Sequence, residues 1–319
     1  MAPSDAASEG AGRGRAARRG TRKVVKRLTG PIRRTRLPAG RVLEPWSGAD
    51  AGRPAHPQEM NMSHDASRRA FIGLGAAAAG EILLARSALA AVAKTKPCVV
   101  VWSEGTAPKD VFPDDINGMI VAGLKQDLPG WEVVKAGLDD PEQGLPDDLL
   151  AACDVLVWWG HKKHGKVADA LVDKIEKRVK EEGMGFIALH SAHFAKPNKR
   201  LMNDKCSWGK YVCDSTTLKV TVTDPGHPIC KGLPKEFSFV HLERYSEPYA
   251  VPEPQSVPLQ GVHTLKDGKE DASRVGLCWQ IGKGKFFYFQ AGHETSPVYA
   301  DPNVRKIMAN AVLWAAPAK

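Results

Sequence analysis

The sequence predicts an α/β fold of three layers, in which a mostly parallel sheet lies between helices and gains β-hairpins in its second half. Three observations support this prediction. Strand-like and helix-like segments alternate between residues 97 and 189, which is typical of a parallel sheet with helices on both faces. Strand-like segments then follow one another up to residue 289, and a last helix-like segment closes the chain. Residues 97–319 are also numerous enough to bury the core of one domain.

The first half of this domain contains the clearest elements. Residues 97–104 form an apolar, β-branched run that predicts a buried strand. Residues 113–128 predict a helix with acidic residues in its first turn. Residues 167–182 predict the most regular helix, because apolar side chains recur at three- and four-residue spacing and Gly183 follows. The other elements expected here are a short helix at 145–152 and strands at 131–138, 153–159 and 185–189.

The second half is predicted to be rich in strands. The expected strands cover residues 218–223, 237–242, 257–265, 274–279 and 285–289. Turn residues at 281–284 indicate that the last two strands form a hairpin that returns to the main sheet. Residues 303–316 predict the closing helix.

The first 96 residues differ from the rest of the chain. We expect residues 1–62 to be a disordered basic leader or the product of a wrongly assigned start codon, since their composition cannot build a core. Residues 63–93 resemble a twin-arginine signal peptide, with Arg68-Arg69, an apolar stretch and small residues at the expected cleavage site. Export to the periplasm, or elsewhere outside the cytoplasm by the twin-arginine route, is therefore predicted, without a stable membrane span.

The charge of the chain is concentrated in this N-terminal region. The whole chain carries a net charge of +9, but residues 1–96 contribute +11 and residues 97–319 contribute −2. Nucleic-acid binding needs a basic face on the folded domain, so we expect no nucleic-acid partner. The first strand is followed by no Gly-x-Gly-x-x-Gly motif, which argues against a nucleotide cofactor.

Histidines follow the apolar runs of the predicted sheet. His161 follows residues 155–159, His190 and His193 follow residues 186–189, and His293-Glu294 follows residues 286–289. A looser case is the run 237–240, which leads to His241 and Glu243. Because the carboxyl ends of parallel strands meet at one edge, where open α/β sheets place their ligand sites, we expect these histidines to line one pocket.

Five segments together resemble the ThuA-like (trehalose utilisation) family. They are Asp-Val-Leu-Val-Trp-Trp-Gly-His at 154–161, Leu-His-Ser-Ala-His-Phe at 189–194, Pro-Gly-His-Pro-Ile at 225–229, Tyr-Ser-Glu-Pro at 245–248 and Phe-Tyr-Phe-Gln-Ala-Gly-His-Glu-Thr at 287–295. The resemblance covers residues 97–319, which defines the expected ThuA-like domain. It implies a flavodoxin-like fold of the class I glutamine amidotransferase-like superfamily and a role in the metabolism of disaccharides and their 3-keto derivatives.

The resemblance also excludes one activity of the superfamily. Glutamine amidotransferases carry a nucleophilic cysteine on the turn after a central strand, where this chain has His190 and Ser191. Without the thiol the chain lacks a glutaminase nucleophile. The late His-x-Glu pair of those enzymes is replaced here by the adjacent His293 and Glu294.

The residue types at this edge indicate specific roles. We expect His293, Glu294 and His190 to be catalytic, because a carboxylate beside an imidazole supports proton transfer. Trp159, His161, Glu104 and Tyr245 are candidates for binding substrate, with the Trp159 ring as an apolar face for a sugar. A divalent transition metal such as Zn or Mn is the candidate cofactor, with His161, His190, His193 and His293 as its ligands. Glu243 and Glu247 are further candidates for the acid of an acid/base pair.

Three functions remain open from the sequence. The first is an enzyme, a hydrolase or a lyase or isomerase, that acts on a sugar or keto-sugar, with an oxidoreductase of the same pathway as a partner. The second is a non-catalytic sugar-binding or accessory subunit. The third is a structural protein, in which His161, His190 and His293 would contribute only to stability. Homo-oligomer formation and a Cys206–Cys213 disulfide are left open, and Cys98, Cys153 and Cys278 are interpreted as buried thiols.

Overall fold

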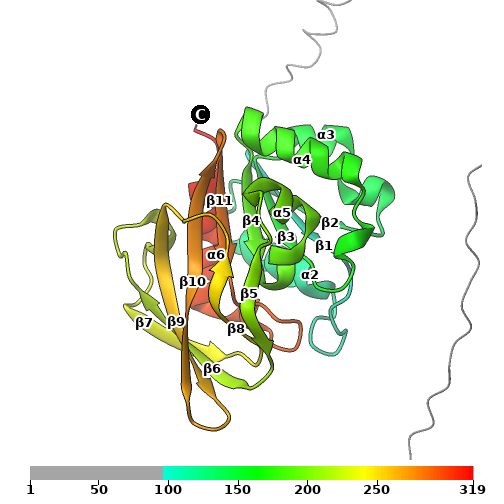
Figure 1. The fold of residues 1–319 in the computed structure, drawn as a ribbon. Helices are drawn as coiled ribbons and strands as arrows, with labels where there is room; N and C mark the ends of the chain where they lie inside the picture. The colour runs from blue at the N-terminus through cyan, green and yellow to red at the C-terminus, as the bar shows by residue number, and fades with distance from the viewer. Residues whose placement is uncertain (1–95, 319) are drawn as a thin grey trace, which may run out of the picture. The chain divides into compact units, whose positions relative to one another are not determined.

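The computed structural model describes residues 96–318, so the predicted leader (1–62) and signal peptide (63–93) lie outside the described residues. A nine-stranded sheet runs through the domain in the order β2-β1-β3-β4-β11-β10-β9-β6-β7, and a second sheet pairs β5 with β8 (Figure 1). The α/β fold class with a mostly parallel first half is as predicted.

The first half of the large sheet is parallel. Strand β1 (Cys98–Ser103) pairs with β2 (Glu132–Gly137) and β3 (Val155–Trp159), and β3 pairs with β4 (Gly185–Leu189). Strand β11 (Gly284–Phe289) then pairs with β4 in parallel. Strands β1, β3 and β4 are completely buried, as expected for strands with helices on both faces.

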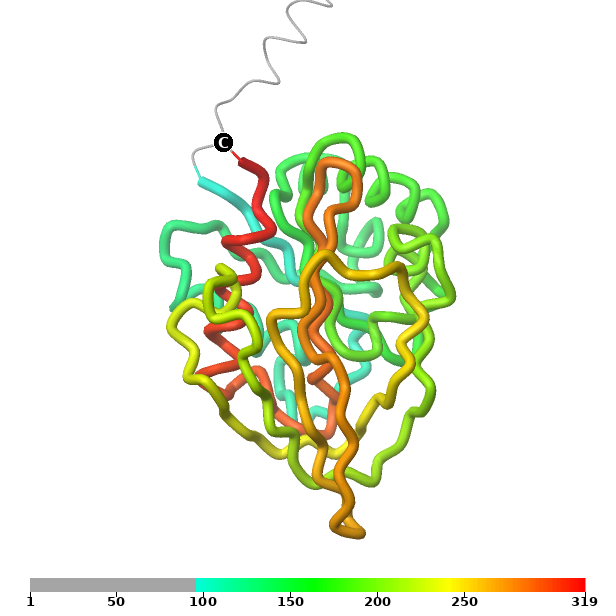
Figure 2. Tube along the Cα trace, turned by 60° about the vertical axis from the view of Figure 1, so that its left-hand side comes forward, coloured from blue at the N-terminus to red at the C-terminus, as the bar shows by residue number. Residues whose placement is uncertain are grey.

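The second half is antiparallel. Strand β10 (Glu270–Ile281) forms the predicted hairpin with β11, and β9 (Ser256–Leu265), β6 (Ser215–Val222) and β7 (Glu236–Val240) follow it in the sheet. Figure 2 shows these yellow and orange strands side by side. Because four antiparallel pairings separate β11 from β7, these two strands point in the same direction. The strands β3, β4, β11 and β7 therefore all end at one edge of the sheet.

Helices cover both faces of the parallel half. One face packs against α2 (Asp115–Asp127) and α6 (Pro302–Ala315), which contact each other. The other face packs against α3 (Asp147–Ala152), α4 (Asp169–Glu182) and α5 (Lys196–Met202). The short 3₁₀ helices are η1 (Pro141–Gly144), η2 (His164–Lys166), η3 (His190–Phe194), η4 (Pro228–Cys230) and η5 (Val298–Ala300).

Particular residues explain where two of the helices end or begin. Helix α4 buries Leu171, Val172, Ile175 and Val179, and Gly183 ends it with φ of +84°, a conformation that costs glycine little. At the start of α6, the Asp301 carboxylate accepts hydrogen bonds from the amides of Asn303 and Val304. These bonds satisfy two amides that the helix itself leaves without partners.

Besides the five 3₁₀ helices, three elements were not predicted. They are α5 and the two strands of the small sheet, β5 (Ser207–Val212) and β8 (Arg244–Ala250). The small sheet covers the same face as α4 and α5, and its Trp208, Tyr245 and Tyr249 are buried there. Across residues 96–318, none of the helices combines the length and the hydropathy that crossing a bilayer requires.

Candidate functional site

The carboxyl edge of the sheet brings together side chains from four strand ends. His161 follows β3, His190 follows β4, Glu243 follows β7, and His293 with Glu294 follows β11. The ring centroids of His161 and His190 each lie 5.4 Å from the ring centroid of His293. In both pairs the two rings are nearly perpendicular. The predicted convergence of these three histidines therefore occurs in the structure.

His190 occupies the turn directly after β4. Its φ is +49°, a left-handed conformation that is strained for a residue with a side chain and is often found at functional sites. The ring is fully buried, and Nδ1 lies 2.7 Å from the Gln290 carbonyl oxygen. A carbonyl oxygen only accepts, so Nδ1 carries a proton and donates it.

This arrangement directs the other nitrogen of His190 at a carboxylate. Nε2 lies 2.8 Å from Glu243 Oε2, and the Tyr245 hydroxyl lies 3.0 Å from both atoms. Burial alone would raise the pKa of Glu243, but the hydrogen bond and charge of His190, together with His293 and Tyr245, lower it to about 2. Glu243 is therefore an anion at neutral pH, it accepts a hydrogen bond from the Tyr245 hydroxyl, and its negative charge would also favour a cation at this position.

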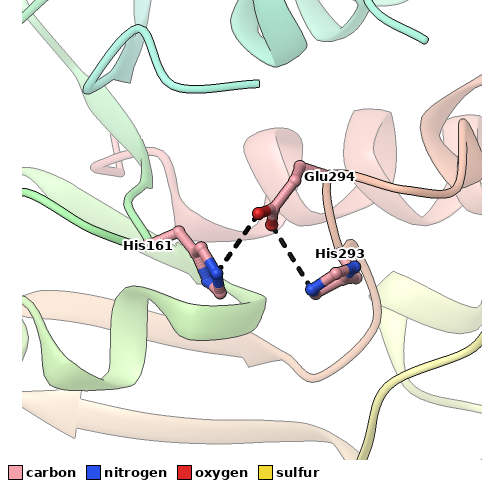
Figure 3. A group of neighbouring side chains, drawn as sticks. All are labelled: His161, His293 and Glu294. Carbon is pink, nitrogen blue, oxygen red and sulfur yellow. Dashed lines mark ion pairs between the residues drawn. The ribbon is translucent and has the colours of Figure 1, made fainter. Parts of the chain in front are cut away.

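A second group lies beside the first (Figure 3). Glu294 extends between two imidazoles, with Oε1 3.2 Å from His161 Nε2 and Oε2 3.5 Å from His293 Nε2. His161 Nδ1 contacts the Ser191 hydroxyl at 2.7 Å, and Lys162 Nζ reaches Glu294 Oε1 at 3.0 Å. Burial lowers the pKa of His293 and His161, and the nearby carboxylates act in the opposite direction.

Both groups offer ligands that suit a metal ion. His161, His293 and Glu294 form one set, and His190, Glu243 and His293 form the other, with the ligand atoms of each set within 4.8 Å of one another. In the first set the Glu294 carboxylate faces both imidazoles, with Oε1 3.2 Å from His161 and Oε2 3.5 Å from His293. Glu294 Oε2 is buried and has no hydrogen-bond partner among the described residues, which is a position that a cation would satisfy.

Two of the predicted substrate-binding residues have a different role in the structure. The ring of Trp159 is fully buried in the core, and its Nε1 donates to the Gly292 carbonyl oxygen at 3.0 Å. It presents no face to a sugar and instead ties the end of β3 to the loop after β11. Glu104 is 1% exposed and accepts hydrogen bonds from the amides of Lys162 and Lys163, so it positions the loop that carries His161.

His193 lies apart from the metal-ligand sets. Its Nδ1 donates to the His190 carbonyl oxygen at 2.9 Å, and its ring packs among Tyr211, Tyr245 and Tyr249. Nε2 is buried without a hydrogen-bond partner among the described residues, and burial lowers the pKa of His193 to about 3. The structure therefore places His193 in the support of the turn after β4, not among the candidate ligands.

The site also contains residues to which the sequence assigned no definite role. Glu243 was one of several candidate acids, and only the direction of β7 shows that it faces His190. Ser191 links His161 to the Tyr245 hydroxyl, which lies 2.9 Å from its Oγ. Thr295 holds His293 through a 2.7 Å contact between Oγ1 and Nδ1. The sequence could have identified Ser191 and Thr295 only by their position, because each lies one or two residues from a predicted site histidine.

The cysteines take no part in this site. Cys206 is buried and Cys213 is exposed, and both thiols are free, so the disulfide that the sequence left open is not formed. Burial raises the pKa of Cys206 to about 12, which keeps this thiol protonated.

Comparisons with known proteins agree with this architecture. The sequence model of the ThuA family, described as trehalose utilisation, matches residues 99–315. The chain belongs to the ThuA family. No protein with a curated description matches the sequence.

Several solved structures resemble this ThuA domain. A ThuA-like protein from Bacteroides uniformis is 19% identical, with a TM-score of 0.47 over 69% of this chain and 92% of its own. A ThuA-like protein from Parabacteroides merdae is 12% identical, with a TM-score of 0.48 over 70% of this chain and 93% of its own. A glutamine amidotransferase from Thermotoga maritima is 11% identical, with a TM-score of 0.42 over 68% and 96%. The domain has the α/β fold class expected from the sequence, with a sheet that is parallel from β2 to β11 and antiparallel from β11 to β7.

Proposed function

We propose that this ThuA protein is an exported enzyme of carbohydrate metabolism that acts on a disaccharide derivative, a 3-keto-glycoside. The observation that carries the proposal is the pair of histidine–carboxylate groups that share His293 at the carboxyl edge of the sheet. Buried, coupled acid/base groups of this kind are typical of catalytic sites. The family description supports the class of substrate.

The residues suit removal of a proton from the carbon beside a keto group. His161 is the most exposed imidazole of the two metal-ligand sets, with 21% of its side chain accessible, and Glu294 stabilises its protonated form. Burial lowers the pKa of His161, so the ring is neutral and able to accept a proton at neutral pH. His190 and Glu243, bridged by the Tyr245 hydroxyl, form a second pair that can return a proton to the departing oxygen. Elimination of the glycosidic oxygen from a 3-keto-glycoside needs both transfers.

A divalent transition metal such as Zn or Mn is part of the proposal. Either His161, His293 and Glu294 or His190, Glu243 and His293 would hold it, and since His293 Nε2 has one lone pair, one ion uses His293 at a time. When bound, such an ion would polarise the keto oxygen of the substrate. In the second set, the Gln290 carbonyl fixes the proton of His190 on Nδ1, so Nε2, which faces Glu243, would be the ligand atom.

Elemental analysis and an activity assay test the proposal together. The purified protein is expected to contain a stoichiometric transition metal and to convert a 3-keto-disaccharide, with both properties lost in His293→Ala. The matched control is His227→Gln, since His227 lies on the turn before η4, where it contacts Ile229 and Trp314. A protein that binds the keto-sugar without metal and without turnover would contradict the enzymatic proposal.

The second candidate is a sugar-binding or accessory subunit. The observation that favours it is the turn after β4, where the strained residue is His190 and not a nucleophilic thiol. In either case, a 3-keto substrate requires an oxidoreductase that oxidises the sugar first, and we propose such an enzyme as the pathway partner.

A further inference from the structure

His241 follows β7 directly and belongs to neither metal-ligand set. Its side chain is buried, and Nε2 accepts a hydrogen bond from the backbone amide of Gly292 at 3.1 Å. An amide N–H can only donate, so Nε2 carries no proton in this contact. A side chain at the end of β7 therefore holds the backbone of the loop that follows β11.

Gly292 is held on three sides. Its amide donates to His241, and its carbonyl oxygen accepts a hydrogen bond from Trp159 Nε1 at 3.0 Å. Its φ is +134°, which suits glycine, and the Tyr299 hydroxyl leaves no room for a Cβ atom at this position. With both backbone polar groups paired and one side covered, this peptide has little freedom to shift.

The two hydrogen bonds of Gly292 join three strand ends of the site. Each member of this Gly292 clamp (Trp159, His241 and Gly292) lies one or two residues before a group of the site, Trp159 before His161, His241 before Glu243, and Gly292 before His293. The ring of His241 also lies edge-on to that of His190, with 5.6 Å between their centroids. The clamp thus connects the chain segments from which the histidine–carboxylate groups extend.

We propose that His241 is a positioning residue that, through the amide of Gly292, fixes His293 in place. This inference rests on the proposed function, because it assigns His241 to the geometry of that same site. Since Glu294 follows His293, the clamp also sets the position of this carboxylate. Acid/base groups must be placed to within about 0.5 Å, and a displacement of about 1 Å costs on the order of 10²-fold in rate.

Two substitutions of His241 separate this role from simple filling of the core. In His241→Asn the shorter side chain reaches only as far as Nδ1 did, so the buried amide of Gly292 loses its acceptor. In His241→Gln the side-chain oxygen lies where Nε2 was and can accept the same bond. The matched control is His227→Asn, because the ring of His227 also accepts a backbone amide, that of Ile229 at 3.2 Å, on the turn before η4.

Hydrogen exchange tests the clamp without any chemistry. The full chain is prepared with isotope-labelled glycine, and the exchange rate of the Gly292 amide is measured by NMR. In His241→Asn this amide is expected to exchange roughly 10- to 100-fold faster than in the wild type. In His241→Gln and His227→Asn it is expected to exchange at close to the wild-type rate. Equal protection in His241→Asn and the wild type would overturn the proposal.

Steady-state kinetics with a 3-keto-disaccharide test the consequence for the site. His241→Asn is expected to lower kcat by roughly 10- to 100-fold, with little change in KM, because His241 is buried and acts only through the backbone of another residue. His241→Gln is expected to recover most of this loss. Equal loss of kcat in the two variants, or a change confined to KM, would contradict a positioning role.

The two proposals fail in distinguishable ways. If the wild type converts no keto-sugar, the proposed function fails, whereas the exchange rates of Gly292 still decide whether His241 holds the loop. Turnover by the wild type with unchanged exchange in His241→Asn does the reverse. If His241→Asn does not fold, Trp159→Phe removes the donor to the Gly292 carbonyl and keeps an aromatic ring in the core. It is expected to lower kcat, and an unchanged kcat would count against the clamp.

Discussion

The position of a single proton determines what His190 can do. Its Nδ1 proton is held by the buried Gln290 carbonyl, so chemistry at this ring is confined to Nε2. Glu243 and Tyr245 both converge on that atom. A residue in this environment can exchange a proton with Glu243 or bind a cation, but it cannot turn its ring without leaving a buried carbonyl unpaired.

Replacement of Glu243 tests this convergence. Glu243→Gln keeps the shape of the side chain but removes the charge that faces His190 Nε2, and kcat/KM for the keto-glycoside is expected to fall by roughly 10²- to 10⁴-fold. Steady-state kinetics measure the effect. Glu247→Gln is the matched control, because Glu247 pairs with Arg274 outside the site. Equal losses in both variants would assign Glu243 a structural role.

His193 gives a prediction about stability and pH. Burial lowers its pKa to about 3 in the folded chain, against an ordinary value of 6.5. The unfolded chain therefore binds a proton that the folded chain does not between about pH 6.5 and 3. Its contribution to stability is fully present above pH 6.5 and is lost as the pH falls towards 3.

In His193→Phe this acid-dependent loss is expected to disappear. Urea titrations at several pH values between about 4 and 6 give the slope of the free energy of unfolding against pH. This slope is expected to decrease by the contribution of about one proton. The His190 carbonyl keeps a partner in this variant, because the Tyr288 hydroxyl also donates to it. An unchanged slope would show that His193 is protonated in the folded protein.

At the residue scale, the sequence predicted which histidines meet but not what each neighbouring group does. The rule that parallel strands end together was sufficient for His161, His190 and His293. The same rule could not show that Trp159 turns into the core or that Glu104 binds backbone amides, since those outcomes depend on side-chain direction. Glu243 became identifiable only when the antiparallel pairings fixed the direction of β7.

Among the elements, those with strong periodicity were predictable and the short polar ones were not. Helix α4 and the buried strands β1, β3 and β4 follow from apolar patterns that local physics favours. Strand β5 alternates poorly, with exposed residues at three successive positions, and its pairing with β8 contains a register shift. Helix α5 has only seven residues and three basic side chains. Tertiary contacts, not local sequence preference, stabilise such elements.

The cap of α6 provides a test at this scale. Asp301→Ala removes the acceptor for the amides of Asn303 and Val304, and it is expected to lower the free energy of unfolding by about 1 kcal/mol. Asp301→Asn retains a capping oxygen and is expected to cost less. Urea denaturation of both variants measures the difference, and equal stability of the two would show that charge or solvent, not the capping bond, satisfies this helix end.

At the scale of the whole molecule, the net charge is distributed unevenly along the chain. The excess of basic over acidic residues lies in residues 1–96, which carry a net charge of +11, whereas residues 97–319 carry −2. The positive charge of the chain therefore gives no reason to expect binding of nucleic acid by the domain.

Export provides the prediction at this scale. Replacement of Arg68 and Arg69 by lysine is expected to retain the protein in the cytoplasm of a bacterium with a twin-arginine translocase. Fractionation of cells that express the full chain measures this outcome, with Arg18→Lys and Arg19→Lys as the matched double control. Release of the Arg68/Arg69 variant into the periplasm at the wild-type level would contradict the signal-peptide interpretation.

Strand β11 is inserted in the middle of the large sheet, between β4 and β10, although it is the last strand of the chain. During synthesis, a ribosome releases the other eight strands of this sheet before the one that completes it. Until then β4 has an open edge, and such edges promote aggregation. Chains that terminate before β11 would thus lack His293 and Glu294 and would leave the edges of both β4 and β10 unpaired.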